Sequence, residues 1–142
     1  ISAADIDLQM LGVRALASGA AADVAAAVAA NAAAARKGVG YAENAMGVLA
    51  SLGHVDEAFA VARGLYLDEG FSVGERRFGS GQFAVATRRR LTHPLFLPQT
   101  RPMRRDARFE ALVSDIGLAD YWRASGHGPD DAPFGPDKPQ GG

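Results

Sequence analysis

Two turns, each centred on a glycine, constrain the fold of this 142-residue chain more than any other feature. The first turn ends the apolar stretch Leu11–Gly19 and the second lies within Leu49–Ala58, so that Gly19 and Gly53 are 34 residues apart. A spacing of this size, with helical patterns on both sides of each glycine, is typical of proteins built from repeated pairs of helices. The spacing predicts an all-α fold whose two antiparallel helical hairpins cover about residues 5–37 and 39–69.

Apolar periodicity around the second turn supports this prediction. The apolar side chains before the turn follow the spacing of one helix face, namely Ala42, Ala45, Met46, Leu49 and Ala50. Those after the turn form a second stripe of the same kind, namely Val55, Ala58, Phe59, Ala62, Leu65 and Tyr66. The alanine-rich stretch from Asp23 to Lys37 stops at Gly38, and it supplies the second helix of the first hairpin.

The residue types that enzymes and metal sites use most are scarce in this chain. It contains no cysteine, which excludes disulfides, thiol catalysis and thiolate metal ligands. None of its histidines, His54, His93 and His127, has a second ligand at metal-binding spacing on a helix face. The chain also lacks a phosphate-binding loop, a dinucleotide fingerprint and a nucleophile elbow. We therefore expect no catalytic residue, no metal ligand and no cofactor, and we do not expect an enzyme.

The most apolar run of the chain does not indicate a membrane span. Residues Val24–Ala35 are mostly alanine, are interrupted by Asn31, and are too few to cross a bilayer. Nothing in the sequence resembles a secretory signal, and the absence of cysteine fits a reducing compartment. The expectation is a cytoplasmic protein without membrane contact.

Positive charge is concentrated in one segment, although the net charge of the chain is only −1. Residues 71–108 carry nine arginines against two acidic residues, whereas residues 1–70 and 109–142 each carry a net charge of −4. Several glycines and the loss of periodicity predict an irregular, arginine-rich loop over residues 70–104. The candidate partner-binding residues on this loop are Arg76, Arg77, Arg88, Arg89 and Arg90.

Three interpretations of these arginines are open. They bind an acidic protein surface, they pair with acidic helices of the same chain, or they contact nucleic acid over residues 76–105. The interleaved aromatic rings of Phe78, Phe83 and Phe96 fit the third interpretation, because bases stack on such rings. A nucleic-acid-binding module is usually strongly basic, and this chain is not. Nucleic acid is therefore disfavoured against an acidic protein or peptide.

The C-terminal part predicts a cap for the helical array. A helix over residues 106–124, with Asp106 as its N-cap, places apolar side chains on one face and two aromatic residues behind them, namely Phe109, Leu112, Ile116, Tyr121 and Trp122. Repeat arrays need such an atypical last unit, because it covers an apolar surface that would otherwise face water. Glycine, proline and aspartate dominate afterwards, so residues 127–142 are expected to form a flexible tail.

Three stretches in this C-terminal part also resemble a known family. Arg105–Phe109 (RDARF), Leu112–Leu118 (LVSDIGL) and Asp120–Gly126 (DYWRASG) resemble the closing segment of bacterial, mainly alphaproteobacterial, regulators. In that family a tetratricopeptide-type helical array often follows a winged-helix DNA-binding domain or a nucleotide-cyclase domain. The resemblance implies that residues 1–126 form one tetratricopeptide-like domain. It departs from the repeat pattern at Leu8 and Ala42, where bulky aromatic residues are usual.

Together, these observations predict a protein-interaction or regulatory module of a bacterial signalling or transcriptional regulator. Its partner is expected to be an acidic protein or peptide, or another domain of a longer parent chain. Arrays of this kind bind peptides in the concave groove that the first helices of the units form. The alternative is an accessory domain that contacts nucleic acid through residues 76–105.

Overall fold

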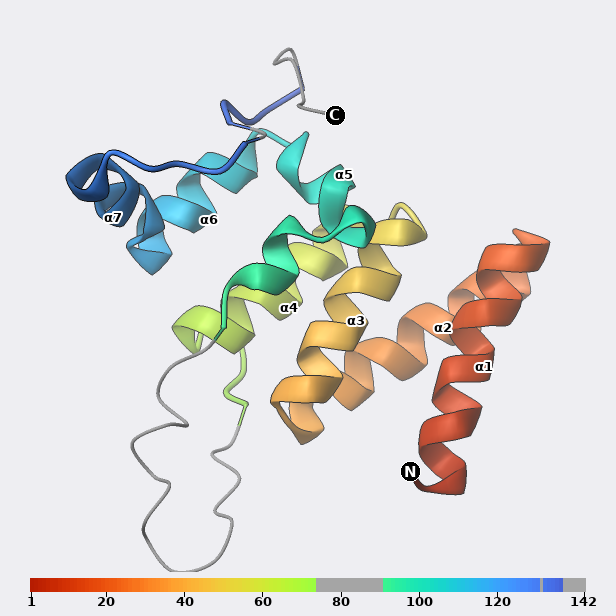
Figure 1. Cartoon of the computed structure of the whole chain (residues 1–142). Helices are drawn as coiled ribbons and strands as arrows, with labels where there is room; N and C mark the ends of the chain where they lie inside the picture. Colours follow the sequence, from red (N-terminus) through yellow and green to blue (C-terminus); the bar gives the residue numbers. More distant parts are fainter. Residues whose placement is uncertain (74–90, 131, 137–142) are drawn as a thin grey trace, which may run out of the picture.

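The computed structural model describes residues 1–73, 91–130 and 132–136, and over these ranges the chain is all-α (Figure 1). The described α-helices are α1 (Ala3–Ser18), α2 (Ala21–Ala34), α3 (Val39–Ser51), α4 (Val55–Leu67), α5 (Arg101–Arg104), α6 (Arg108–Ile116) and α7 (Leu118–Ser125). Short 3-10 helices complete the order, namely η1 (Ala35–Lys37), η3 (His93–Phe96) and η4 (Pro98–Thr100). Figure 1 shows α1 at one end of the molecule and α6 with α7 at the other.

The first four helices form two hairpins around the two predicted turn glycines. Gly19 and Gly53 have positive φ angles of 62° and 79°, a conformation that glycine adopts without steric cost. At the second turn, the backbone N–H groups of Gly53 and His54 donate to the carbonyls of Ala50 and Leu49, which closes the C-terminus of α3. The predicted helices on both sides of both turns are therefore present. Their assignment to tetratricopeptide repeats stays a prediction.

The core consists of the two apolar stripes that periodicity predicts. All five apolar side chains of the α3 stripe are fully buried. In α4, Ala58, Phe59, Ala62 and Leu65 are buried, and Tyr66 is partly buried. Half of these ten side chains are the methyl groups of alanine, so the two stripes bury little area per residue. Larger side chains from the second half of the chain complete the core.

The loop predicted over residues 70–104 is wrong for its second part. Residues 93–104 form short helical turns that begin at or near prolines, since proline favours the first turn of a helix. Leu95 and Met103 are fully buried, which ordinary surface loops do not show. The three prolines of this stretch hide its helical character from periodicity. The predicted partner-binding arginines lie outside the described residues, namely Arg76, Arg77, Arg88, Arg89 and Arg90.

The single capping helix predicted over residues 106–124 is instead two helices, α6 and α7. Gly117, with a φ of 94°, ends α6 and allows the chain to change direction before α7. Ala107 rather than Asp106 stands at the N-cap position, and the Asp106 carboxylate accepts a hydrogen bond from the backbone N–H of Arg108 at 2.9 Å.

The predicted cap residues separate into three groups by burial. Phe109 and Leu112 are fully buried, and Ile116 and Trp122 pack against the core with part of their surface exposed. Tyr121 is 65% exposed, so the prediction that it is buried is wrong. The turn at Gly117 sets the direction of α7, and neighbouring residues on a helix point about 100° apart, so Trp122 faces inward while Tyr121 does not.

The tail predicted to be flexible over residues 127–142 docks at residues 132–136. Phe134 is 5% exposed, and its ring centroid lies 4.7 Å from that of Phe109 and 6.2 Å from that of Trp122. The backbone N–H of Gly135 donates to the carbonyl of Arg104 at 2.9 Å. One aromatic residue and one hydrogen bond thus hold a segment whose glycine, proline and aspartate content indicated disorder.

Two ion pairs join α6 to α4. Arg108 contacts the Asp56 carboxylate at 2.8 Å, and Arg63 contacts that of Asp115 at 2.9 Å. Both pairs connect residues 52 positions apart, which indicates that the two helices run in the same direction. The Arg108 guanidinium also lies 4.6 Å from the centroid of the Phe59 ring. Its pKa is raised above the usual value by hydrogen bonds to Asp106 and then to Asp56.

We expect Phe134 to contribute substantially to stability. Replacing it with alanine should lower the free energy of unfolding by about 3 kcal/mol, because a buried aromatic ring and its contacts are lost. The matched control is Tyr121→Ala, which removes an exposed ring from the same end of the molecule and should change stability by less than about 0.5 kcal/mol. Urea unfolding followed by circular dichroism measures both, and equal effects would contradict the docking of the tail.

Candidate functional site

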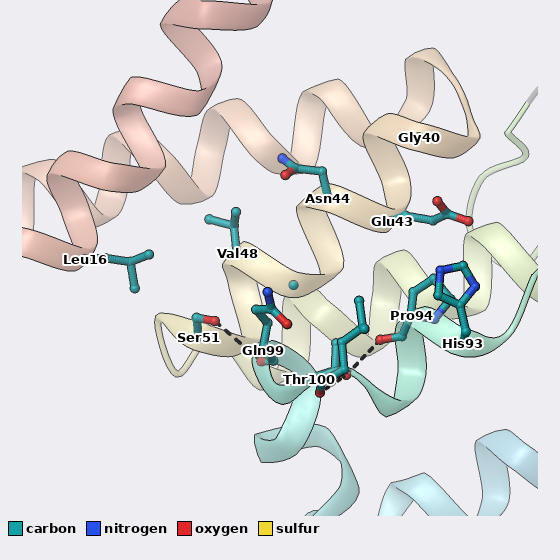
Figure 2. A pocket seen from close by; sticks show the side chains of 12 residues that line it. Leu16, Gly40, Glu43, Asn44, Val48, Ser51, His93, Pro94, Gln99 and Thr100 are labelled. Carbon is teal, nitrogen blue, oxygen red and sulfur yellow. Dashed lines mark hydrogen bonds between the residues drawn. The ribbon is translucent and has the colours of Figure 1, made fainter.

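A groove of about 340 Å³ lies beside α3 and is the strongest candidate for a binding site in the described part of the chain. One wall comes from α1 through Leu16, and the floor comes from α3. The other wall is the 3-10 segment, by which we mean η3 and η4 (residues 93–100). Figure 2 shows these side chains around the space that we call the central groove.

Two glycines keep the floor of the central groove free of side chains. Gly40 and Gly47 are both helical residues of α3 that line the groove. A Cβ atom added at Gly40 would meet nothing within 4 Å, and one at Gly47 would lie 3.6 Å from the Cβ of Gln99. Glycine inside a helix costs about 0.5–1 kcal/mol relative to alanine, and packing does not require it here. The bare floor lets another backbone approach α3 closely.

A chain of side-chain amides positions Asn44 at the groove. Asn31 is buried, and it donates to the carbonyl of Ala27 at 2.9 Å while its own side-chain oxygen accepts from Asn44 at 3.3 Å. Gln9 of α1 in turn donates to the side-chain oxygen of Asn44 at 3.4 Å. These bonds use one of the two N–H groups of Asn44, so the other can donate to a ligand.

The end of the groove near α1 is apolar. Leu16 and Leu97 line it and are 53% and 41% exposed, and Val48 of α3 lies beside Leu16 (Figure 2). A Cβ atom added at Gly12 would lie 3.5 Å from Val48, an ordinary van der Waals contact, so α1 lies close to α3 at this point. An exposed pair of leucines beside a bare helix surface can accept an apolar side chain of a ligand.

The buried guanidinium of Arg104 holds the 3-10 segment in place. Arg104 is 5% exposed, and its Nη1 donates to the carbonyls of Leu95 at 2.8 Å and Leu97 at 3.0 Å. The same nitrogen lies 3.2 Å from the hydroxyl oxygen of Thr100, and that hydroxyl donates to the carbonyl of Pro94 at 2.8 Å. Arg104 belongs to the arginine-rich segment, yet it acts inside the fold and cannot contact nucleic acid from this position.

The charges at the groove differ from those of the arginine-rich segment. Glu43 and His93 are the ionisable groups among the residues described as lining it. Near Glu43, the hydroxyl of Tyr66 donates to the carbonyl of Leu91 at 3.0 Å. This hydrogen bond fixes the residues that lead into the 3-10 segment. Burial, and secondarily Glu43, raises the pKa of Tyr66 above its ordinary range. The described residues that line the groove include no lysine or arginine that could attract an acidic ligand.

Among the predicted site residues that the structure describes, none lines the central groove. The predicted arginines lie outside the described residues, and the predicted cap residues form the far end of the molecule. Sequence reasoning missed Gly40 and Gly47 and gave them no role. The sequence does contain a signal, because Gly40 and Gly47 lie seven residues apart on one helix face with Asn44 between them. Two glycines lower the stability of a helix, so their presence on one face suggests that another group approaches that face.

Comparison with models of known protein families, with curated protein sequences and with solved structures found no significant match. The resemblance of residues 105–126 to regulators with tetratricopeptide-type arrays therefore stays a prediction. Across the described ranges, no group of three or more histidine and carboxylate side chains is arranged to hold a metal ion. None of the helices described above combines the length and the apolar character needed to cross a membrane.

A second cavity, of about 540 Å³, lies between α1 and α2 and contains a strongly hydrogen-bonded carboxylate. Asp5 accepts from the hydroxyl of Tyr41, and it forms a capping box with Ser2 at the start of α1. The hydrogen bond from Tyr41 and then those from Ser2 lower the pKa of Asp5 from 3.8 to about 2. The carboxylate thereby joins α1 to the start of α3.

This carboxylate predicts a pH dependence of stability. The pKa of Asp5 is lower in the folded chain, so its contribution is complete above the ordinary value of 3.8 and is lost as pH falls through about 2. Tyr41→Phe removes the largest cause, so the pKa of Asp5 should rise towards 3.8. The advantage in melting temperature of the wild type over the variant should then shrink between pH 4 and 2, as measured by carboxyl NMR titration and thermal melts. An unchanged Asp5 pKa in the variant would contradict this role of Tyr41.

Removing the Arg104 side chain should strongly destabilise the protein. Arg104→Met leaves the carbonyls of Leu95 and Leu97 without this donor, and the expected loss of unfolding free energy is about 2–4 kcal/mol. The neighbouring Arg105 is exposed, and Arg105→Met removes the same charge at a cost below about 0.5 kcal/mol. Urea unfolding separates the two variants, and equal stabilities would show that the guanidinium does not hold the 3-10 segment.

Proposed function

We propose that this chain is a protein-interaction module that binds a peptide segment of its partner in the central groove. The observation that supports this most directly is the bare floor at Gly40 and Gly47, where there is space for side chains that the sequence does not supply. A peptide in this groove can bring its backbone against α3. Its function would be to recruit or regulate a partner rather than to catalyse a reaction.

The chemistry of the groove fits a peptide better than a small charged metabolite. Asn44 and Gln99 carry side-chain amides that can pair with the N–H and C=O groups of a peptide backbone. Leu16 and Leu97 offer an apolar contact to one of its side chains. Helical arrays commonly recognise extended or helical peptides through such grooves.

The regulatory part of the proposal rests on the family resemblance of residues 105–126. In such regulators the peptide could come from another protein or from another domain of the parent chain. The alternative, a nucleic-acid contact through residues 76–105, rests mainly on residues outside the described ranges. Arg104 belongs to that segment and is occupied inside the fold, which leaves this alternative with less support.

Filling the floor of the groove should abolish peptide binding without loss of stability. We would select ligands for the wild-type chain from a random peptide library and measure the affinity of a synthetic, labelled peptide by fluorescence anisotropy. Gly40→Leu places a side chain in open space and replaces a poor helix former. The dissociation constant should rise by at least about tenfold, with an equal or higher melting temperature.

The matched control is Ala29→Leu, which adds similar bulk to an exposed position of α2 away from the groove. It should leave the affinity for the peptide unchanged. Equal affinities for the wild type and Gly40→Leu would place the peptide elsewhere and contradict the proposal. Tight binding of labelled oligonucleotides at physiological salt, with a steep salt dependence lost in an Arg88, Arg89 and Arg90 triple alanine variant, would favour the nucleic-acid alternative.

A further inference from the structure

Exposed apolar side chains gather on α1. Of the large apolar residues that are exposed in the described part of the chain, four belong to this helix, and Ile1 precedes it. Ile6, Met10 and Val13 are 53%, 50% and 56% exposed. Leu16 belongs to the central groove, so the other three form a separate surface, which we call the α1 stripe.

The α1 stripe points away from the rest of the array. With about 100° between successive residues, Ile6, Met10 and Val13 fall within an arc of about 60° on one face of the helix. The buried residues of α1, Gly12 and Ala15, lie on a different face and pack against the rest of the molecule. The solvent-facing side of a surface helix is normally polar. Here that face is apolar.

The charged residues beside the α1 stripe indicate which kind of partner can cover it. Asp7 and Arg14 are exposed, are seven residues apart, and flank the stripe along the same edge, since seven residues make nearly two helical turns. No hydrogen bond or ion pair in the described structure involves either side chain. When two identical helices pair antiparallel, each edge of one helix faces the same edge of the other, as the charged flanking positions of coiled coils do. Asp7 of one copy then lies opposite Arg14 of the other, and the reverse holds by symmetry.

The parallel arrangement lacks this complementarity. In a parallel pair, the edge with Asp7 and Arg14 would meet the other edge of the second helix, which carries Gln9 and Leu16. Gln9 already donates to Asn44, and Leu16 lines the central groove. The antiparallel register also places Met10 near the two-fold axis and Ile6 beside Val13 of the second copy.

We propose that α1 is a self-association surface, on which two copies of this chain pair antiparallel through the α1 stripe, with Asp7 of each copy facing Arg14 of the other. The helix has 16 residues and is therefore about 24 Å long. Two such helices bury less area than the standard interface of stable complexes. The dimer is thus a reversible one that forms with rising concentration, and it leaves both central grooves open.

A charge-swap series tests both the occupant and the register. Sedimentation velocity over a concentration series should show a monomer–dimer equilibrium for the wild type. Asp7→Arg and Arg14→Asp should each weaken the dimer by at least about tenfold, because like charges then face each other. The double variant carrying both changes should recover wild-type affinity, since the pair is restored with reversed signs. Circular dichroism melts verify that each variant folds.

Two further variants complete the design. Met10→Glu should give a monomer, whereas Tyr121→Glu, which alters an exposed apolar residue far from α1, should dimerise like the wild type. Gly40→Leu should also dimerise normally, so that failure of the peptide-binding proposal and of this one can be told apart. A wild type that stays monomeric up to roughly 0.5 mM overturns the proposal, and so does a dimer that survives Met10→Glu. A double variant as weak as the single ones overturns the antiparallel register.

Discussion

The buried guanidinium of Arg104 is the interaction on which the second half of the structure depends. The 3-10 segment has few backbone hydrogen bonds of its own, because short turns that begin at prolines leave carbonyls without partners. Arg104 donates to the carbonyl of Leu95 and to that of Leu97, which also accepts from the backbone N–H of Thr100. The carbonyl of Arg104 in turn accepts from Gly135. A charged group can be buried at this position because its hydrogen bonds compensate part of the lost hydration. The wall of the central groove and the docked tail therefore share one residue.

The two ends of the molecule differ in whether their apolar surface is covered. At the C-terminal end, Phe96, Phe109, Trp122 and Phe134 form an aromatic cluster that covers the alanine-rich core, which supplies little apolar area of its own. Aromatic rings are efficient for this purpose, since each buries a large area and packs edge to face. At the N-terminal end, α1 keeps apolar residues towards water. The proposed pairing of two copies through the α1 stripe would cover these residues.

Sequence reasoning succeeded where one period governs a whole helix. The stripes of α3 and α4 and the turns at Gly19 and Gly53 follow from spacing alone, because each helix there is longer than three turns. It failed where an element is too short for apolar periodicity to be recognised. The helical turns around Pro94 and Pro98 resemble a loop in sequence, and a break at Gly117 separates two helices that read as one.

The candidate site was missed for a related reason. The groove is the space that α1, α3 and the 3-10 segment leave between them. Sequence patterns predict which side chains are buried, and they do not predict where such a space remains. Gly40 and Gly47 therefore resembled weak points of a helix, although their surroundings show space rather than strain. The docking of Phe134 depends on ring contacts with Phe109 and Trp122, which composition cannot reveal.

The double role of Arg104 couples two distant parts of the molecule thermodynamically. Its side chain fixes the groove wall, and its backbone carbonyl fixes Gly135 beside the aromatic cluster. A ligand in the groove requires the ordered 3-10 segment, and the docked tail requires the ordered α5. Both therefore select the same conformation of Arg104. By linkage, each must then raise the equilibrium constant of the other by the same factor. If a peptide binds in the groove as proposed, residues 132–136 would act as an intramolecular effector of that binding.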